Sequence, residues 1–254
     1  MEYDQRLARA LRAPDGPSIV RVYGWRPPAI SLGWHQSPDE VNLQKCAEAG
    51  IDVVRRPTGG RAILHSDEVT YCVVMAAGGQ GVLATYQKIS EALIIGLSSI
   101  GVDAMLEKSQ PHFPSLYKTP SSAACFASAA RYEIHVGGRK LVGSAQRRLV
   151  GADGREVVLQ HGSILLGPDH LRIVDFLNLP DEETRERMRG ELHSLTTDLS
   201  RACGRQVEFD EVEEALRRGF ELSWGIKFQE IRTLAAMGES EASSTGGIET
   251  SVVV

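Results

Sequence analysis

The feature that most constrains this chain is a run of three strand-like segments separated by two tight-turn signals. Residues 131–136 precede the pair Gly137-Gly138, residues 139–149 precede the sequence GADG at 151–154, and residues 156–166 follow. Such short turns join neighbouring antiparallel strands, because glycine readily adopts the positive φ angles that hairpin turns need. The run therefore predicts an antiparallel β-meander.

Other strand-like and helix-like segments are interspersed without the regular alternation that a parallel α/β sheet shows. The patterns predict strands at 18–25, 29–34, 51–54 and 68–75. They predict helices at 5–11, 86–100, 171–177, 182–203 and 212–222, and we expect the last three to cover one sheet face. The fold class is therefore α+β, with a mixed, largely antiparallel sheet packed with helices.

One further helix is predicted from its capping residues. Ser37, Pro38 and Glu40 form a capping box with proline at the first helical position, and Gly50 follows twelve residues after Pro38 as a stop signal. The pattern therefore predicts one continuous helix between Pro38 and Gly50.

Length and composition indicate one folded domain with a short tail. The chain has 254 residues, 42% of them apolar, which is enough to bury a sizeable core. After Gly238 the sequence becomes ESEASSTGGIETSVVV, which is rich in Ser, Gly, Glu and Thr. We therefore expect a catalytic domain at 1–237 and a flexible C-terminal tail at 238–254.

Charge and hydropathy exclude several classes of partner. The chain has 28 Lys and Arg residues against 33 Asp and Glu, so its net charge of -5 provides no broad basic surface for nucleic acid or an anionic membrane. The acidic N-terminus does not resemble a signal peptide, and no run of about 18 apolar residues is present. We expect a cytoplasmic protein that binds neither nucleic acid nor membrane.

The cysteines and histidines do not form a metal-binding pattern. Cys46, Cys72, Cys125 and Cys203 are far apart and include no CxxC pair, which predicts reduced thiols. His65, His135 and His161 lack the spacing and acidic neighbours of a metal site. We therefore predict no metal of the protein's own.

The loop RRPTGGR at 55–61 is the first candidate binding element. Gly59 and Gly60 would let backbone amides approach a ligand closely, and Arg56 and Arg61 could offer planar donors to a carboxylate or phosphate. The alternative is an ordinary hairpin turn bordered by solvated arginines. Spacing by itself does not decide between the two.

A second candidate combines a cysteine with a lysine. Cys125 lies in a loop of small residues at 108–130, and Lys140 on the neighbouring hairpin could stabilise its thiolate. Cys125 could equally be a packing residue and Lys140 a surface amine. His161, which begins a strand, is compatible with either a base or a hydrogen-bonded structural residue.

These motifs together resemble a known superfamily. RRPTGGRAILH, ACF, YEIHVGGRKLVGSAQRR and LQHGSILL stand in the order found in the biotin/lipoate protein ligases and octanoyltransferases, and the resemblance covers residues 30–228. The GGR form of the glycine loop, with ACF fifteen residues before the lysine of GRK, is most similar to the cysteine-dependent octanoyltransferases. The resemblance implies the ligase catalytic-domain type of fold.

The resemblance also implies roles for individual residues. Cys125 would be the acyl-accepting nucleophile and Lys140 its catalytic partner. The residues expected to bind substrate are Arg56, Gly59, Gly60, Arg61 and His65 at the acyl and carbonyl end, Gly143, Ser144 and Gln146 on the opposite wall, and His161 and Gly162 nearby. Two departures from the family pattern are a strand that usually precedes the first helix and an acidic residue that often follows the histidine, where this chain has Ser66.

The implied activity is transfer of an octanoyl group from octanoyl-acyl carrier protein, through the Cys125 thioester, to a lysine of the glycine-cleavage H protein or an E2 lipoyl domain. No cofactor would be needed, and strand residues such as Ile63 and Val73 would line the acyl tunnel. One alternative is a lipoate-protein ligase that uses ATP and Mg²⁺ to form lipoyl-AMP. Another is a non-catalytic module that binds acylated or lipoylated domains.

Overall fold

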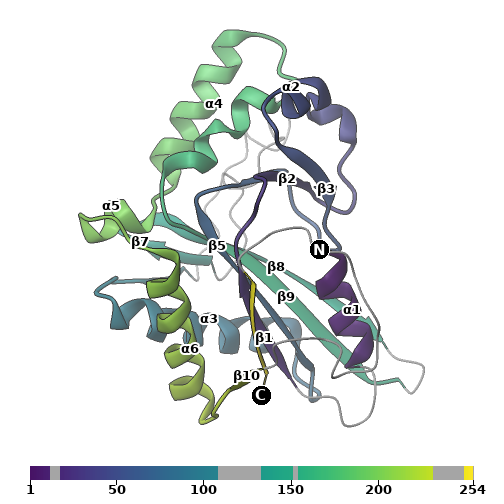
Figure 1. The fold of residues 1–254 in the computed structure, drawn as a ribbon, viewed down its shortest axis with the longest axis vertical. Coiled ribbons are helices and arrows are strands. Elements are labelled where there is room, and N and C mark those ends of the chain that lie inside the picture. The colour runs from purple at the N-terminus through teal and green to yellow at the C-terminus, as the bar shows by residue number, and fades with distance from the viewer. Residues whose placement is uncertain (12–17, 108–132, 151–153, 231–248, 254) are drawn as a thin grey trace.

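The structure is a computed structural model of the chain, and it describes residues 1–11, 18–107, 133–150, 154–230 and 249–253. These residues form two β-sheets with helices packed around them (Figure 1). The large sheet has eight strands in the order β10-β11-β1-β5-β9-β8-β7-β6, and the small sheet has three in the order β3-β2-β4. The predicted α+β class with a largely antiparallel sheet is confirmed.

Every neighbouring pair in the large sheet is antiparallel. Its strands are β1 (Ile19–Tyr23), β5 (Glu68–Ala76), β6 (Met105–Glu107), β7 (Glu133–Val136), β8 (Arg139–Val150), β9 (Glu156–Leu165), β10 (Gln229–Glu230) and β11 (Glu249–Val253). Strands β7, β8 and β9 form the predicted meander, and Gly137 and Gly138 adopt φ angles of 56° and 75° in the first turn. Residues 151–153 of the second turn lie outside the described residues.

The small sheet contains one parallel pair and one antiparallel pair. Its strands are β2 (Ala29–Leu32), β3 (Asp52–Arg55) and β4 (Ile63–His65). Strand β2 lies in the centre, parallel to β3 and antiparallel to β4. The chain therefore crosses over β2 between β3 and β4, and this crossing segment is the glycine loop.

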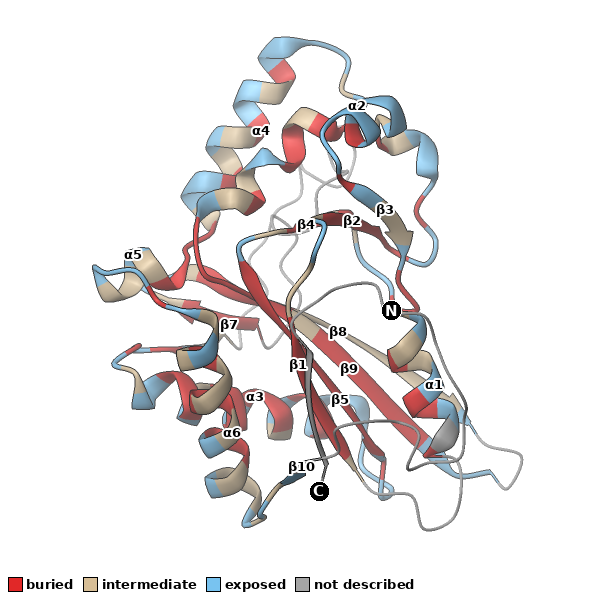
Figure 2. Cartoon of the chain, in the orientation of Figure 1, coloured by how far each residue is buried: buried red, intermediate tan, exposed pale blue. Residues whose placement is uncertain are grey.

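Three apolar clusters hold the helices in place. On one face of the large sheet, α3 (Val82–Ser99) and α6 (Phe209–Trp224) cover the largest cluster, and α1 (Glu2–Ala10) packs on the opposite face. The small sheet packs against α2 (Leu43–Glu48), the 3-10 helix η3 (Pro168–Phe176) and α4 (Glu182–Leu195). Figure 2 shows the central strands of the large sheet as buried and the helices with exposed outer faces. The helices at the C-terminal end thus divide between the two sheets, and the prediction that they cover one face is wrong.

Two predicted helices are interrupted. Between Pro38 and Gly50 the chain forms the 3-10 helix η1 (Pro38–Glu40) and then α2, because Val41 is extended and pairs with Leu177, and Asn42 caps the second helix. Near the C-terminal end, α4 stops at Leu195 and α5 (Leu199–Cys203) begins after a new cap at Asp198. In both places a side-chain cap starts a second helix, whereas the sequence pattern predicts a single continuous helix.

The C-terminal end of the chain bears on the predicted domain boundary at residue 238. Residues 231–248 lie outside the described residues, so the boundary at residue 238 stays a prediction. Glu249–Val253 form β11 between β1 and β10, which differs from the flexible tail expected there. None of the helices in the described ranges combines the length and apolar character needed to cross a bilayer.

Candidate active site

A cavity of about 220 Å³ lies where the glycine loop and β4 face strands β8 and β9. Val157 and Leu159 of β9 pack against α1, and His161 and Ser163, at the same two-residue spacing, line the cavity. The cavity is therefore on the same face of the large sheet as α1. Its lining includes Lys140 and the predicted substrate residues Arg56, Gly59, Gly60, His65, Gly143, Ser144, Gln146, His161 and Gly162. Arg61 is the predicted substrate residue that the lining does not include.

The cavity is hollow on the sheet side because β8 presents small residues there. Gly143 pairs with Ser163, which pairs in turn with Thr70, and Ala145 pairs with His161 in the next row. Directly opposed residues of antiparallel strands point to the same face. A glycine and an alanine between longer side chains therefore leave space above the sheet.

Gly162 lies in the floor of the cavity in a position that excludes a side chain. A Cβ atom there would lie 2.4 Å from the Gly143 carbonyl oxygen and 2.7 Å from Cε1 of Tyr71. The Tyr71 hydroxyl lies 2.6 Å from Ser144 Oγ, and burial raises the pKa of Tyr71 to about 12. Gln146 donates to the Gln160 side chain at 3.0 Å. The predicted opposite wall is therefore held together from beneath by neutral hydrogen bonds.

The two residues predicted for the acyl tunnel lie on different sides of the large sheet. Ile63 lines the cavity, but Val73 belongs to the cluster between the large sheet and α3 and α6. Side chains alternate along a strand, so Val73 of β5 points away from the cavity, and Thr70 is the β5 residue that lines it. The prediction that Val73 faces the cavity is wrong, because its side chain is on the opposite face of β5.

The glycine loop is a crossover connection and not a hairpin turn. Its flanking strands β3 and β4 pair with opposite sides of β2 and not with each other. Gly60 has a φ angle of 99°, and Gly33 at the end of β2 lies so close that a Cβ atom there would be 1.9 Å from the Gly60 carbonyl oxygen. Close backbone packing therefore fixes the loop against the small sheet.

Arg56 organises this loop from within. Its buried guanidinium donates to the Ser31 carbonyl at 2.8 Å, to the Gly59 carbonyl at 2.9 Å and to the Arg61 carbonyl at 2.6 Å. The sequence predicts that the Arg56 guanidinium donates to a carboxylate or phosphate of a ligand. In the structure the same N–H groups donate to the loop backbone and to Ser31. Arg61 itself lies outside the cavity, half-exposed, with its guanidinium 3.6 Å from the Glu40 carboxylate.

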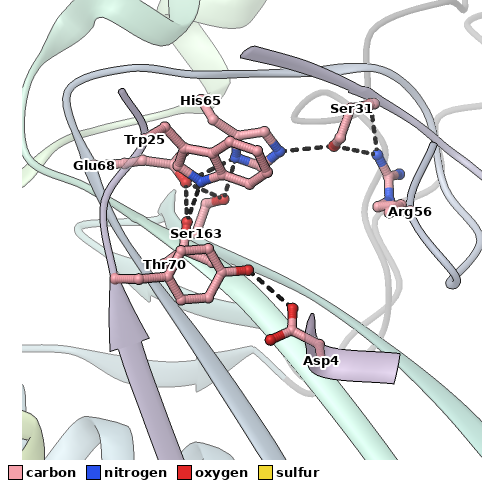
Figure 3. Close-up of polar contacts among 9 residues, drawn as sticks. Asp4, Trp25, Ser31, Arg56, His65, Glu68, Thr70 and Ser163 are labelled. Carbon is pink, nitrogen blue, oxygen red and sulfur yellow. Dashed lines mark hydrogen bonds and ion pairs between the residues drawn. The ribbon is translucent and has the colours of Figure 1, made fainter. Parts of the chain in front are cut away.

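His65 is part of a buried polar network that Figure 3 shows. Its Nε2 lies 2.7 Å from Ser31 Oγ and its Nδ1 lies 2.8 Å from Glu68 Oε1, while its ring stacks on Trp25 with 4.3 Å between ring centres. The same Glu68 oxygen accepts from Thr70 and Ser163. Because both ring nitrogens are engaged, this arrangement suits His65 to bracing the small sheet against the large one.

His161 differs from His65 in having one ring nitrogen with no hydrogen-bond partner among the described residues. Its Nε2 lies 2.6 Å from Thr58 Oγ1 in the glycine loop, whereas its buried Nδ1 is unpaired. Burial lowers the pKa of His161 to about 4, so the ring is neutral near pH 7. A neutral imidazole can offer either a lone pair or an N–H to a molecule in the cavity.

Lys140 is buried in the cavity wall, which excludes the surface-amine alternative. Its Nζ lies 2.5 Å from Glu133 Oε1, and the two side chains are 6% and 3% exposed. Cys125, the predicted nucleophile, lies outside the described residues together with the rest of its loop. The predicted approach of the thiol to Lys140 therefore stays a prediction.

Sequence reasoning missed several residues of the site. Glu133, Thr70 and Ser163 line the cavity, and Ser31 and Trp25 support His65 behind it. The signal for Ser163 was its two-residue spacing from His161 on one strand. Glu133 gave no comparable signal, because the segment 131–136, RYEIHV, contains other charged and polar residues. Ser31 and Trp25 carried no such signal, because only the packing of the two sheets brings them to the site.

The remaining predictions concern thiols and metals. Cys46 and Cys72 are buried free thiols, and Cys203 is a partly buried one. Burial, with the nearby Asp4 carboxylate, raises the pKa of Cys72 well above its ordinary value, which makes it a packing residue. In the described part of the chain, no group of three or more His, Cys, Asp or Glu side chains is arranged to hold a metal ion.

Comparison with known proteins identifies the family. The family model for the lipoyl protein ligase A/B catalytic domain matches residues 1–221. The chain therefore belongs to the lipoyl protein ligase A/B catalytic-domain family.

Curated relatives define the branch within the family. The chain is 39% identical over 234 residues to octanoyltransferase LipM of Kyrpidia tusciae, covering 90% of this chain and 84% of that protein. It is 36% identical over 220 residues to octanoyltransferase LipM of Bacillus subtilis, covering 84% and 77%. The predicted placement in the octanoyltransferase branch is confirmed.

Solved structures agree with the fold. The chain is similar to a bipartite lipoate protein ligase from Thermoplasma acidophilum, with a TM-score of 0.69, 22% identity and coverage of 90% of this chain and 81% of that one. It is also similar to a lipoate-protein ligase A bound with ATP, with a TM-score of 0.68, 23% identity and coverage of 89% and 80%. At these identities the similarity establishes the ligase catalytic-domain type of fold that the sequence predicts.

Proposed function

We propose that this octanoyltransferase takes an octanoyl group from an acyl carrier protein onto Cys125 and delivers it to the lysine of a lipoyl-accepting protein. The observation that carries the proposal is the cavity, which gathers Lys140 and every predicted substrate residue except Arg61. The choice of octanoyl as the transferred group rests on the curated octanoyltransferase relatives. A non-catalytic binding module would not need a buried lysine in such a cavity.

In the first step the Cys125 thiolate attacks the thioester carbonyl of the acylated carrier. A new carbon–sulfur bond forms to Cys125, the bond to the carrier sulfur breaks, and the carrier leaves as a thiol after taking up one proton. Lys140 is the proposed source of positive charge beside the two sulfurs. Amides of the loop at Gly59 and Gly60 are proposed to hold the oxyanion, a contribution worth on the order of 100-fold in rate.

In the second step the acceptor lysine attacks the Cys125 thioester as a neutral amine. A carbon–nitrogen bond forms, the bond to Cys125 breaks, and the proton that the nitrogen loses returns to the sulfur. Thioester exchange is nearly balanced and amide formation from a thioester is downhill, so this route needs neither ATP nor another cofactor. This energetic balance distinguishes it from a ligase that activates a free acid.

The proposed acceptor is a lipoyl domain of an E2 subunit or a glycine-cleavage H protein. A structural neighbour is described as a bipartite lipoate protein ligase with its E2 lipoyl domain. This chain shares its fold, and the lysine side chain of such a domain would fit a cavity in which small residues such as Gly143 and Ala145 leave space.

The test is the intact mass of the protein after mixing with octanoyl-acyl carrier protein. We expect a gain of one octanoyl group on the wild-type protein, no gain on Cys125→Ser, and loss of the added mass when a lipoyl domain is supplied. A gain on Cys125→Ser would contradict the thioester on Cys125. Modification of the lipoyl domain only with ATP and free octanoate would replace the proposal by the ligase alternative.

A further inference from the structure

Glu133 is a buried carboxylate in the cavity wall that forms an ion pair with Lys140. Both residues line the cavity, and Glu133 Oε1 lies 2.5 Å from Lys140 Nζ. We propose that Glu133 is a positioning residue for acyl transfer, which holds the Lys140 amine at the place where the thioester reacts. This inference rests on the proposed function and adds a residue that acts through Lys140.

The local strand geometry directs both side chains into the cavity. The pairing of β7 with β8 shifts between Ile134 and His135, so that Ile134 opposes Val142 while His135 opposes Lys140. Leu141 and Val142, which are consecutive, therefore both belong to the apolar cluster on the helix side of the sheet. Such a bulge re-aims the residues around it, and here Lys140 lies on the opposite, cavity side.

The backbone at Lys140 is fixed from a second direction. The Lys140 carbonyl accepts a hydrogen bond of 2.9 Å from the Thr197 amide, and Lys140 forms an isolated bridge with Thr196. Thr196 and Thr197 belong to the short segment between α4 and α5. The main chain is thus held in place, while the four-carbon side chain would still have rotational freedom without an anchor at its end.

Glu133 supplies that anchor. A free lysine side chain samples many rotamers, and an opposite charge at hydrogen-bonding distance restricts it to one arrangement. Burying both charges has a desolvation penalty that an apolar pair of similar volume would avoid. A pair kept at this cost inside a reaction cavity is therefore explained by what it does to Lys140 and not by stability.

The test compares the rate of octanoyl-enzyme formation in Glu133→Gln, Glu133→Asp and the control Glu156→Gln. Glu156 is on the same sheet and forms an ion pair of 2.6 Å with Arg148, but its side chain is 42% exposed and outside the cavity. We expect Glu133→Gln to lower the rate of the acyl-transfer step by on the order of 10- to 100-fold, with little change in KM for the carrier. Glu133→Asp should be less affected, and Glu156→Gln should match the wild type.

A double-mutant cycle separates positioning from general loss of structure. If Glu133 acts through Lys140, Glu133→Gln should cause no further loss of rate in a Lys140→Met background, because the two changes then remove one shared interaction. Thermal unfolding of each variant checks folding, and the double variant Glu133→Gln/Lys140→Met, in which both members of the pair are neutral, remains measurable if a single variant unfolds.

The outcomes are distinguishable from those of the proposed function. A wild-type protein that acquires no octanoyl group overturns the proposed function and this inference with it. A wild-type protein that is acylated, with Glu133→Gln acylated equally fast, overturns the inference and leaves the function standing. Independent losses in the double variant would likewise overturn it, because Glu133 would then act without Lys140.

Discussion

The two walls of the cavity are held in different ways. The sheet wall consists of regular strands in which Gly143 and Ala145 leave space, and its geometry follows from backbone pairing. The loop wall has irregular backbone, in which the guanidinium of Arg56 donates to the Gly59 and Arg61 carbonyls and also holds the loop to Ser31 of β2. A sheet can therefore form a cavity wherever small residues leave space, whereas a loop needs a buried side chain to fix its shape.

The walls also differ in how they treat charge. The sheet wall contains the Lys140–Glu133 pair and the neutral ring of His161. The loop wall contains the Arg56 cation, which is surrounded by carbonyl oxygens and its neighbour Ser31. The Lys140–Glu133 pair of the sheet wall therefore faces the cavity, whereas the Arg56 cation of the loop wall stabilises the loop backbone.

The largest effect is expected when the loop wall loses its organising side chain. Arg56→Met would leave the buried Ser31 carbonyl and the part-buried Gly59 and Arg61 carbonyls without this donor, and we expect it to lower the free energy of unfolding by about 3–5 kcal/mol. Urea unfolding measures the change. The matched control is Arg61→Met, expected to cost less than about 1 kcal/mol because this guanidinium is half-exposed. Equal losses in the two variants would contradict the organising role of Arg56.

An intermediate effect is expected from pH, through His161. Its pKa in the folded protein is about 4, against an ordinary value of 6.5, because burial disfavours the charged ring. The unfolded chain therefore binds a proton that the folded chain does not, and the contribution to stability is lost as the pH falls from about 7 to about 4. At about 1.4 kcal/mol for each pH unit, the loss is on the order of 3 kcal/mol.

The measurement is the free energy of unfolding of wild type and His161→Gln at pH 7 and pH 5. The other titrating groups are shared by both proteins, so the difference between their pH slopes isolates the imidazole. The variant should lose less stability on acidification. Parallel slopes would show that the ring in the cavity wall titrates normally.

The smallest effect is expected from adding one methyl group to the sheet wall. Gly162→Ala would place a Cβ atom 2.4 Å from the Gly143 carbonyl oxygen, and the required shift of β8 and β9 should cost about 1–3 kcal/mol. Thermal unfolding measures it. Gly190→Ala in α4 is the control, because its Cβ atom would meet nothing within 4 Å and alanine favours a helix by up to about 1 kcal/mol. Destabilisation of both variants alike would mean that the sheet wall is not closely packed.

Much of the fold was predictable because its signals are local. The predicted turn at Gly137 and Gly138 is confirmed, because two adjacent glycines suit the positive φ angles observed there. The helix expected between Pro38 and Gly50 was misjudged because Val41 is extended, and what makes it extended is its pairing with the distant Leu177. The position of Arg61 was missed for a similar reason, since its distance from the cavity depends on how the loop crosses β2.

The sequence by itself determined the family, the α+β class and the identities of most cavity residues, because motifs and turn chemistry are properties of neighbouring positions. Only the tertiary structure decided which side chains face the cavity and which partners they have: Glu133 beside Lys140, Thr58 beside His161, and Ser31 between His65 and Arg56. These contacts join segments from two sheets. Their geometry follows from how the sheets pack and from a shift in strand register, and the order of residues along the chain records neither.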